Sequence, residues 1–110
     1  MQAAGIDAFG GDVQIIELQA PASPAPDEVV ISVFAAGVGN WDEFVRVGTW
    51  DVGRRPPLAL GVEAAGVVAA VGEDVTNLAP GDEMLTHPLP LRHHGAWAEW
   101  LVAPAALVAP

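Results

Sequence analysis

The fold is decided by the stretch Gly61-Val62-Glu63-Ala64-Ala65-Gly66-Val67-Val68-Ala69-Ala70-Val71-Gly72. This stretch is apolar along almost its whole length, yet glycines interrupt it. Pro80-Gly81-Asp82 then marks a turn, and apolar residues resume at Met84. The pattern predicts two neighbouring strands joined by a polar connection, the first from about Val62 to Val71. Within that strand, Gly66 indicates a bulge or a close approach of another backbone.

Composition sets the size and excludes several kinds of site. The 110 residues suffice for one domain with a single core. The chain has no cysteine, which excludes disulfides, thiolate nucleophiles and cysteine-ligated zinc. Fourteen acidic residues face only four basic ones, so the net charge of -10 repels phosphate backbones and no nucleic-acid partner is expected.

The sequence contains no membrane signal. No uncharged apolar run approaches the roughly 18 residues that a transmembrane helix needs. The N-terminus lacks the basic region of a signal peptide. We therefore expect a soluble, cytoplasmic chain that does not bind membranes.

The first third of the chain has the pattern of a hairpin followed by a strand. Residues 1–9 and 13–18 are part-apolar segments on either side of a Gly-Gly-Asp turn. The proline-rich residues 19–27 must form a connection, because proline cannot donate to a sheet. The β-branched run that follows predicts a strand within residues 28–38 that is covered on both faces.

One short helix is predicted after that strand. Asn40 is a suitable N-cap, with Glu43 three positions later, and Arg46 and Gly48 suit the last turn and the C-cap. Residues 49–57 are then expected to be a loop.

Short strands dominate the remaining sequence. The pattern predicts a strand at 84–86, a loop at 87–94 and a strand at 95–102, the last with alternating faces. Many short strands and one helix indicate a mainly β, mostly antiparallel, barrel-like fold.

Two phosphate-binding motifs can be rejected. The turn at 37–42 lies between a strand and a helix, but Asp42 replaces the third glycine of a dinucleotide fingerprint. Asp42 and Glu43 also place negative charge where a pyrophosphate would bind. Gly61 and Gly66 have P-loop spacing, but valines replace the residues that contact phosphate and metal.

The three histidines suggest metal chemistry only weakly. His87, His93 and His94 lie in one proline-rich loop, with Asp82 and Glu83 nearby. Imidazole and carboxylate are suitable ligands, but the spacing matches no common metal site. We expect solvated loop histidines and no metal.

Four tryptophans leave two interpretations open: Trp41, Trp50, Trp97 and Trp100. They can pack in the core and at the mouth of the barrel. Alternatively, Trp50 forms one wall of a ligand pocket beside Asn40, whose amide can donate to and accept from a bound carbonyl or carboxamide.

Taken together, these residues resemble the N-terminal GroES-like domain of medium-chain dehydrogenases and reductases, and most closely the quinone oxidoreductase branch. The resemblance covers nearly the whole chain. It rests on Ala36-Gly37-Val38-Gly39-Asn40-Trp41-Asp42, Arg46-Val47-Gly48-Thr49-Trp50, Pro57, Gly61 to Val68, Val71-Gly72, Val75, Pro80-Gly81-Asp82 and Gly95-Ala96-Trp97-Ala98-Glu99-Trp100. It implies a GroES-like, partly open β-barrel with one short helix.

The resemblance also implies chemistry without zinc. In the zinc alcohol dehydrogenases of that superfamily, a cysteine stands at the position of Gly39 and a histidine at that of Val62. The lobe that binds structural zinc is reduced to a short loop between Asp82 and Gly95. The resemblance therefore implies a zinc-independent reductase in which NADPH passes a hydride to a quinone or an activated alkene.

Four residues are expected to border the nicotinamide and a small hydrophobic carbonyl or quinone substrate: Asn40, Asp42, Trp50 and Val62. Asn40 is the one expected to contact the cofactor. Relatives have a tyrosine at the position of Trp50, so this chain lacks the phenolic hydroxyl there.

Residues 1–110 would form the GroES-like domain alone, without the Rossmann domain of the family. We therefore expect NADPH binding and activity only with a nucleotide-binding domain, in the same chain or a separate one. Two alternatives stay open. The chain could be a stand-alone non-redox module that binds or folds a small hydrophobic molecule, or an assembly module that pairs with another copy of itself.

Overall fold

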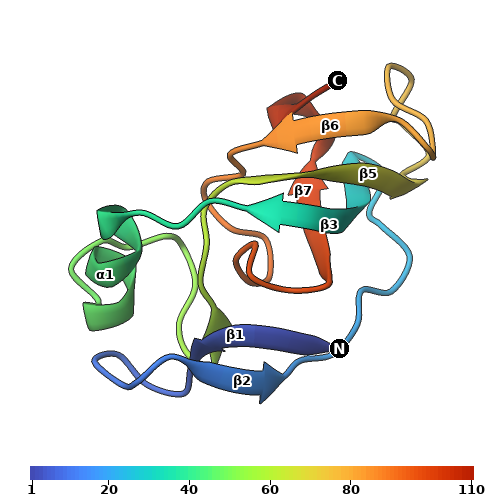
Figure 1. Ribbon diagram of the computed structural model, residues 1–110. Helices are drawn as coiled ribbons and strands as arrows, with labels where there is room; N and C mark the ends of the chain where they lie inside the picture. Colours follow the sequence, from blue (N-terminus) through green and yellow to red (C-terminus); the bar gives the residue numbers. More distant parts are fainter.

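The computed structural model describes residues 1–110 and contains two antiparallel sheets with one α-helix at their side (Figure 1). One sheet has the order β2-β1-β4 and the other the order β7-β3-β5-β6-β8. The elements are β1 (Gln2–Ile6), β2 (Gln14–Glu17), β3 (Glu28–Ala36), α1 (Asn40–Val47), β4 (Leu58–Ala59), β5 (Ala64–Val71), β6 (Glu83–Thr86), β7 (Trp100–Pro104), a 3-10 turn (Ala105–Leu107) and β8 (Val108–Ala109). The predicted mainly β, partly open barrel with one short helix is confirmed. No helix is long and apolar enough to cross a membrane.

Strand β5, at the centre of the larger sheet, comes from the stretch that opened the sequence analysis. It pairs with β3 on one side and β6 on the other, which confirms the predicted neighbouring strands. The register with β3 shifts beside Gly66, between Val33 and Ala35. A Cβ atom on Gly66 would lie 2.1 Å from the Ser32 carbonyl oxygen. The close backbone approach predicted at this glycine is therefore confirmed.

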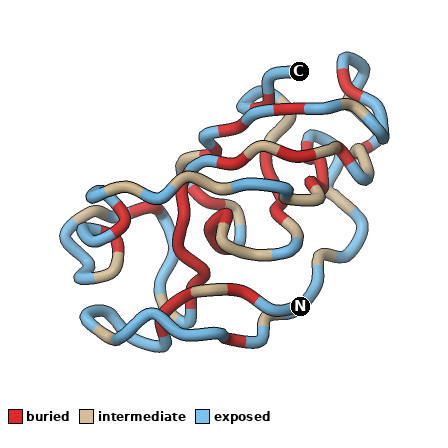
Figure 2. Tube along the Cα trace, in the orientation of Figure 1, coloured by how far each residue is buried: buried red, intermediate tan, exposed pale blue.

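The hairpin β1–β2 is confirmed, but the coverage predicted for β3 is wrong in its second half. Residues 28–31 are buried, whereas Phe34 is 75 % exposed. Strand β7 pairs with β3 only as far as Ser32, so the end of β3 projects beyond its neighbour. Figure 2 shows this change from buried to exposed chain along the strand.

The last predicted strand begins later than expected, at Trp100 instead of Gly95. The residues before it form backbone hydrogen bonds with the chain beside β4: Gly95 N–H donates to Ala59 O at 2.8 Å and Trp97 N–H donates to Leu60 O at 2.8 Å. This segment links the two sheets before the chain enters β7. Strands β4 and β8, each of two residues, were not predicted.

Two main apolar clusters form the core. One lies on the larger sheet. The other lies between α1, the end of β1 and the loops, and consists of Ile6, Val45, Val52, Leu58, Leu60, Val62 and Leu91. Helix α1 contributes only Val45 to it, so the helix packs on the barrel through a narrow face.

The helix begins one residue earlier than predicted, because Gly39 and not Asn40 is the N-cap. The Asp42 carboxylate accepts a hydrogen bond from the Gly39 N–H at 2.8 Å, so Asp42 takes the role that we expected of Glu43. Gly48 ends the helix in the left-handed conformation, as predicted.

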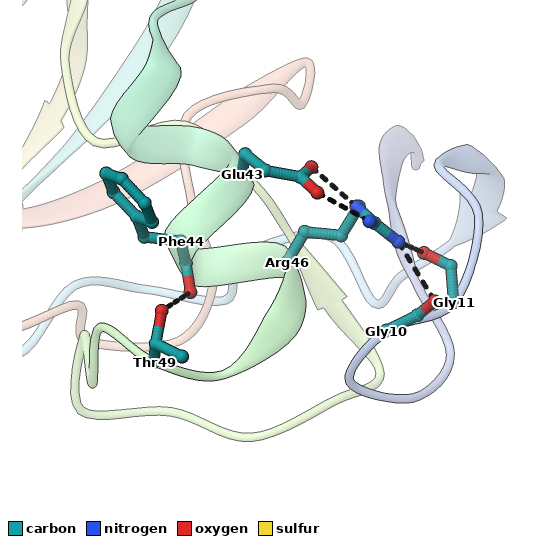
Figure 3. Close-up of polar contacts among 6 residues, drawn as sticks. All are labelled: Gly10, Gly11, Glu43, Phe44, Arg46 and Thr49. Atoms are coloured by element: carbon teal, nitrogen blue, oxygen red, sulfur yellow. Dashed lines mark hydrogen bonds and ion pairs between the residues drawn. The ribbon is translucent and has the colours of Figure 1, made fainter.

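Arg46 fixes the helix to the β1–β2 loop (Figure 3). Its guanidinium donates to the carbonyl oxygens of Gly10 and Gly11, both at 2.9 Å. The same side chain forms two hydrogen bonds to Glu43, at 2.6 and 2.7 Å, and thereby lowers the pKa of that carboxyl. These contacts orient α1 and the turn that precedes it.

Candidate functional site

The turn that leads into α1 lies against the start of the opening stretch. Gly37 N–H donates to Glu63 O at 3.3 Å, and the Trp97 indole N–H donates to Gly37 O at 2.9 Å. Three segments far apart in sequence therefore meet at this turn, which precedes the predicted site residues Asn40 and Asp42.

Asp42 is a buried carboxylate with one unsatisfied oxygen. Its side chain is 4 % exposed, Oδ2 accepts from Gly39, and Oδ1 is buried without a hydrogen-bond partner. Burial raises the pKa of Asp42. The backbone N–H groups of Gly39 and Gly61 act in the opposite direction and lower the pKa. The nearby charge of Glu63 raises the pKa further.

Gly39 and Val62, the positions at which the resemblance implies zinc ligands in related enzymes, offer no polar side chain here. Val62 is 2 % exposed and packs in the aliphatic cluster with Val45 and Leu60. A side chain at Gly39 would collide with the Trp41 ring. No group of three or more histidine, aspartate or glutamate side chains is arranged to hold a metal ion.

Asn40 and Trp50 differ in burial and in their contacts with the rest of the chain. Asn40 is exposed at the first position of the helix, and its amide forms no hydrogen bond within the chain. Trp50 is half-buried against the aliphatic cluster that contains Val62. Its side chain is therefore partly packed on the core and partly open to solvent.

A cavity lies beside this turn and not over the four predicted residues. It encloses about 620 Å³ between the ends of β3, β5 and β6 and the C-terminal segment. Its lining is Ala35, Ala36, Gly37, Glu63, Ala64, Ala65, Leu85, Thr86, His87, Leu107 and Ala109. Gly37 and Glu63 belong both to this cavity and to the turn before α1, so the two features are contiguous.

The cavity is apolar with a few polar groups. Glu63 and His87 provide a carboxylate and an imidazole, while the Thr86 hydroxyl is used by a hydrogen bond to Leu107 O at 2.7 Å. Small alanine side chains form much of the remaining wall. Such a lining suits a flat, apolar molecule with one or two polar atoms. We did not predict from the sequence that Glu63 lines this cavity. The only sequence feature that could have indicated the cavity is the pair of alanines on each of two adjacent strands.

The three histidines differ in their exposure to solvent. His87 and His93 are exposed, as expected, but the prediction of a solvated side chain is wrong for His94, which is 7 % exposed. The His94 Nδ1–H donates to Gly95 O at 2.7 Å. Burial lowers the pKa of His94, the nearby His93 lowers it further, and the bond to Gly95 opposes both.

Stability is expected to fall below pH 6.5 because of His94. Its pKa in the folded chain is below the unfolded value of 6.5, so the unfolded chain binds more protons between those two pH values. The free energy of unfolding should therefore decrease as the pH falls through this window and level off below it. Urea unfolding at a series of pH values measures the effect.

The matched variants for that experiment are His94→Gln and His93→Gln. Removal of the buried imidazole should flatten the dependence in this window, whereas removal of the exposed one should preserve it. A His94→Gln protein with the wild-type slope would show that another group titrates there.

Comparison with known proteins adds independent information. Residues 25–110 match the family described as alcohol dehydrogenase GroES-like domain. The chain is 38% identical over 84 residues to an alcohol dehydrogenase of Moraxella sp. (strain TAE123), covering 76% of this chain and 25% of that protein. It is 36% identical over 106 residues to a quinone oxidoreductase of Lama guanicoe, covering 94% of this chain and 31% of that protein.

A solved structure supports the same family assignment. The quinone oxidoreductase of Escherichia coli, in complex with NADPH, superposes with a TM-score of 0.84 and 28% sequence identity, over 99% of this chain and 32% of that one. The chain thus spans about a quarter to a third of the length of these relatives.

Proposed function

Because the chain belongs to the alcohol dehydrogenase GroES-like domain family, in the quinone oxidoreductase branch of the medium-chain dehydrogenases and reductases, we propose that it is the substrate-side domain of a zinc-independent, NADPH-dependent reductase. The resemblance found in the sequence and its implied fold are confirmed. The proposed substrate is a small quinone or an activated alkene conjugated to a carbonyl group.

The observation that carries the zinc-free proposal is the packing of Val62. Zinc ligands must provide a lone pair, and this position provides a fully packed hydrocarbon side chain. Asp42 lies in the same region, but a single carboxylate cannot complete a tetrahedral site. Polarisation of the substrate by a metal is therefore not part of the proposed reaction.

The cofactor proposal needs a second domain. NADPH, when bound, supplies a hydride to the substrate. The residues of this chain do not fit its pyrophosphate, because Asp42 and Glu43 place acidic groups in the first turn of α1. We therefore assign phosphate binding to a nucleotide-binding domain, in the same chain or in a partner.

The residues of this chain would position the substrate and exclude water. The alanine-lined cavity accepts a flat ring. The free amide of Asn40, which lies outside that lining, is available to hold a carbonyl or carboxamide. Trp50, also outside the lining, provides an apolar side chain without an acidic hydroxyl, so we do not assign a proton to it. Asp42 fixes the start of the helix through the Gly39 N–H.

One observation favours a second candidate function. The 620 Å³ cavity is formed within these 110 residues and needs no other domain. A non-redox module that binds a small hydrophobic molecule there is therefore the alternative. It predicts binding of such a molecule by the isolated chain without NADPH.

Replacement of Trp50 tests the proposed site. In a chimera in which residues 1–110 replace the matching domain of the Escherichia coli quinone oxidoreductase, Trp50→Ala should lower kcat/KM for 1,4-benzoquinone about tenfold or more, a loss of about 1.4 kcal/mol of transition-state stabilisation. Ile15→Ala, which removes an exposed side chain on β2, is the matched control and should leave kcat/KM unchanged. Equal kcat/KM values for the two variants would show that Trp50 is not part of the site.

A further inference from the structure

A second cavity lies on the other side of the molecule from α1. It has a volume of about 560 Å³ and lies between the proline-rich connection 18–25, Pro57, the adjacent His93 and His94, and Val102. It shares no lining residue with the first cavity. Figure 1 shows the connection between β2 and β3 at the side opposite the helix. Nothing in the proposed reduction uses this cavity.

His94 gives the cavity a defined hydrogen-bond acceptor. Because Nδ1 carries the proton that is donated to Gly95 O, Nε2 of the neutral ring holds a lone pair. No group of the protein donates to Nε2. The side chain is more than nine-tenths buried and lines the cavity, and burial favours its neutral form. An uncharged ring nitrogen is thus available to a bound molecule.

The cavity has no unpaired charge. Its one carboxylate, Glu28, accepts from Ala25 N–H at 3.0 Å through Oε1 and from Arg92 at 3.0 Å through Oε2. Arg92 also pairs with Asp27 at 3.1 Å. His93 is exposed at the rim. The one carboxylate in the lining is therefore paired, so the cavity favours an uncharged ligand.

The opposite wall is apolar and has few donors. Pro21, Pro24 and Pro57 contribute apolar rings and no N–H groups, and Leu18 and Val102 add aliphatic surface. Proline-rich segments and aromatic rings pack well against each other, as in proline-peptide recognition. The wall therefore suits the aromatic ring of a ligand, and His94 can accept a hydrogen bond from a hydroxyl group on that ring.

We propose that this cavity is a binding site for a neutral phenol, with the ring against the prolines and the hydroxyl donating to His94 Nε2. The volume is within the range of small-molecule sites. The site requires no cofactor and is separate from the proposed reductase site.

A titration of the unmodified chain, followed by nitrogen NMR of the histidine rings, tests the proposal. Phenol should bind saturably and shift the His94 Nε2 resonance. Anisole, which has the same ring but no hydroxyl proton, should bind at least about tenfold more weakly, a difference of about 1.4 kcal/mol. Equal binding of phenol and anisole, or a shift confined to His93, would overturn the assignment of the donor site.

Matched variants add a second test. His94→Leu should weaken phenol binding at least about tenfold, whereas His87→Leu, at an exposed histidine outside this cavity, should leave it unchanged. Thermal unfolding of each variant shows whether it is folded, and the comparison of phenol with anisole on the unmodified chain stands independently of both. Unchanged binding to a folded His94→Leu protein would contradict the proposal.

Discussion

The Gly66→Ala variant is expected to lose about 3 kcal/mol of unfolding free energy. The new Cβ atom would lie 2.1 Å from the Ser32 carbonyl oxygen, well inside contact distance. The obstacle is backbone in the neighbouring strand, so it cannot rotate away as a side chain could. Relief requires β3 and β5 to separate at the centre of the larger sheet. Urea unfolding measures the loss.

Gly81→Ala is the control for this substitution. A Cβ atom on Gly81 would meet no atom within 4 Å, but the residue has a φ of 96°, which an L side chain rarely adopts. Its expected cost is about 1 to 2 kcal/mol, from conformation alone. If Gly66→Ala cost no more than Gly81→Ala, the close approach of β3 to β5 would not be a determinant of the fold.

Replacement of Val62 by aspartate is expected to cost about 4 kcal/mol, a large share of the stability of a domain of this size. Val62 is 2 % exposed and surrounded by aliphatic side chains, so the new carboxylate would have no hydrogen-bond partner and would lie near the buried Asp42. The midpoint of urea unfolding should fall accordingly.

Val38→Asp makes the same chemical change at a residue that is 78% exposed. It should alter the free energy of unfolding by no more than about 0.5 kcal/mol. A small effect of both substitutions would mean that position 62 is open to solvent, and that a polar ligand could be accommodated there.

The strands could be predicted where the sequence pattern is local. The opening stretch and the hairpin have their apolar residues and turn residues within a few positions of one another, and both were found. The late start of β7 could not be predicted in this way. Residues 95–97 form backbone hydrogen bonds with residues 59–61, in β4 and directly after it, which are far away in sequence. The exposed end of β3 likewise depends on where β7 ends.

The site was only partly predictable for the same reason. The turn before α1 was recognised, but the choice of Gly39 over Asn40 as N-cap depends on Asp42 reaching back to the Gly39 N–H. Glu63 lines the alanine-rich cavity only because three strands and the C-terminal segment meet there. His94 is buried in a segment whose next residue, Gly95, bonds to Ala59 far earlier in the chain, so no local pattern shows its burial.

The central claim is that this domain completes a reductase that uses NADPH and no zinc. The most direct measurement is the rate of NADPH oxidation by the chimera with the Escherichia coli nucleotide-binding domain, with 1,4-benzoquinone as substrate and with or without a zinc chelator. We predict quinone-dependent oxidation of NADPH at a rate that the chelator does not change. Loss of the activity with the chelator, or a folded chimera that binds NADPH but does not reduce the quinone, would contradict the account.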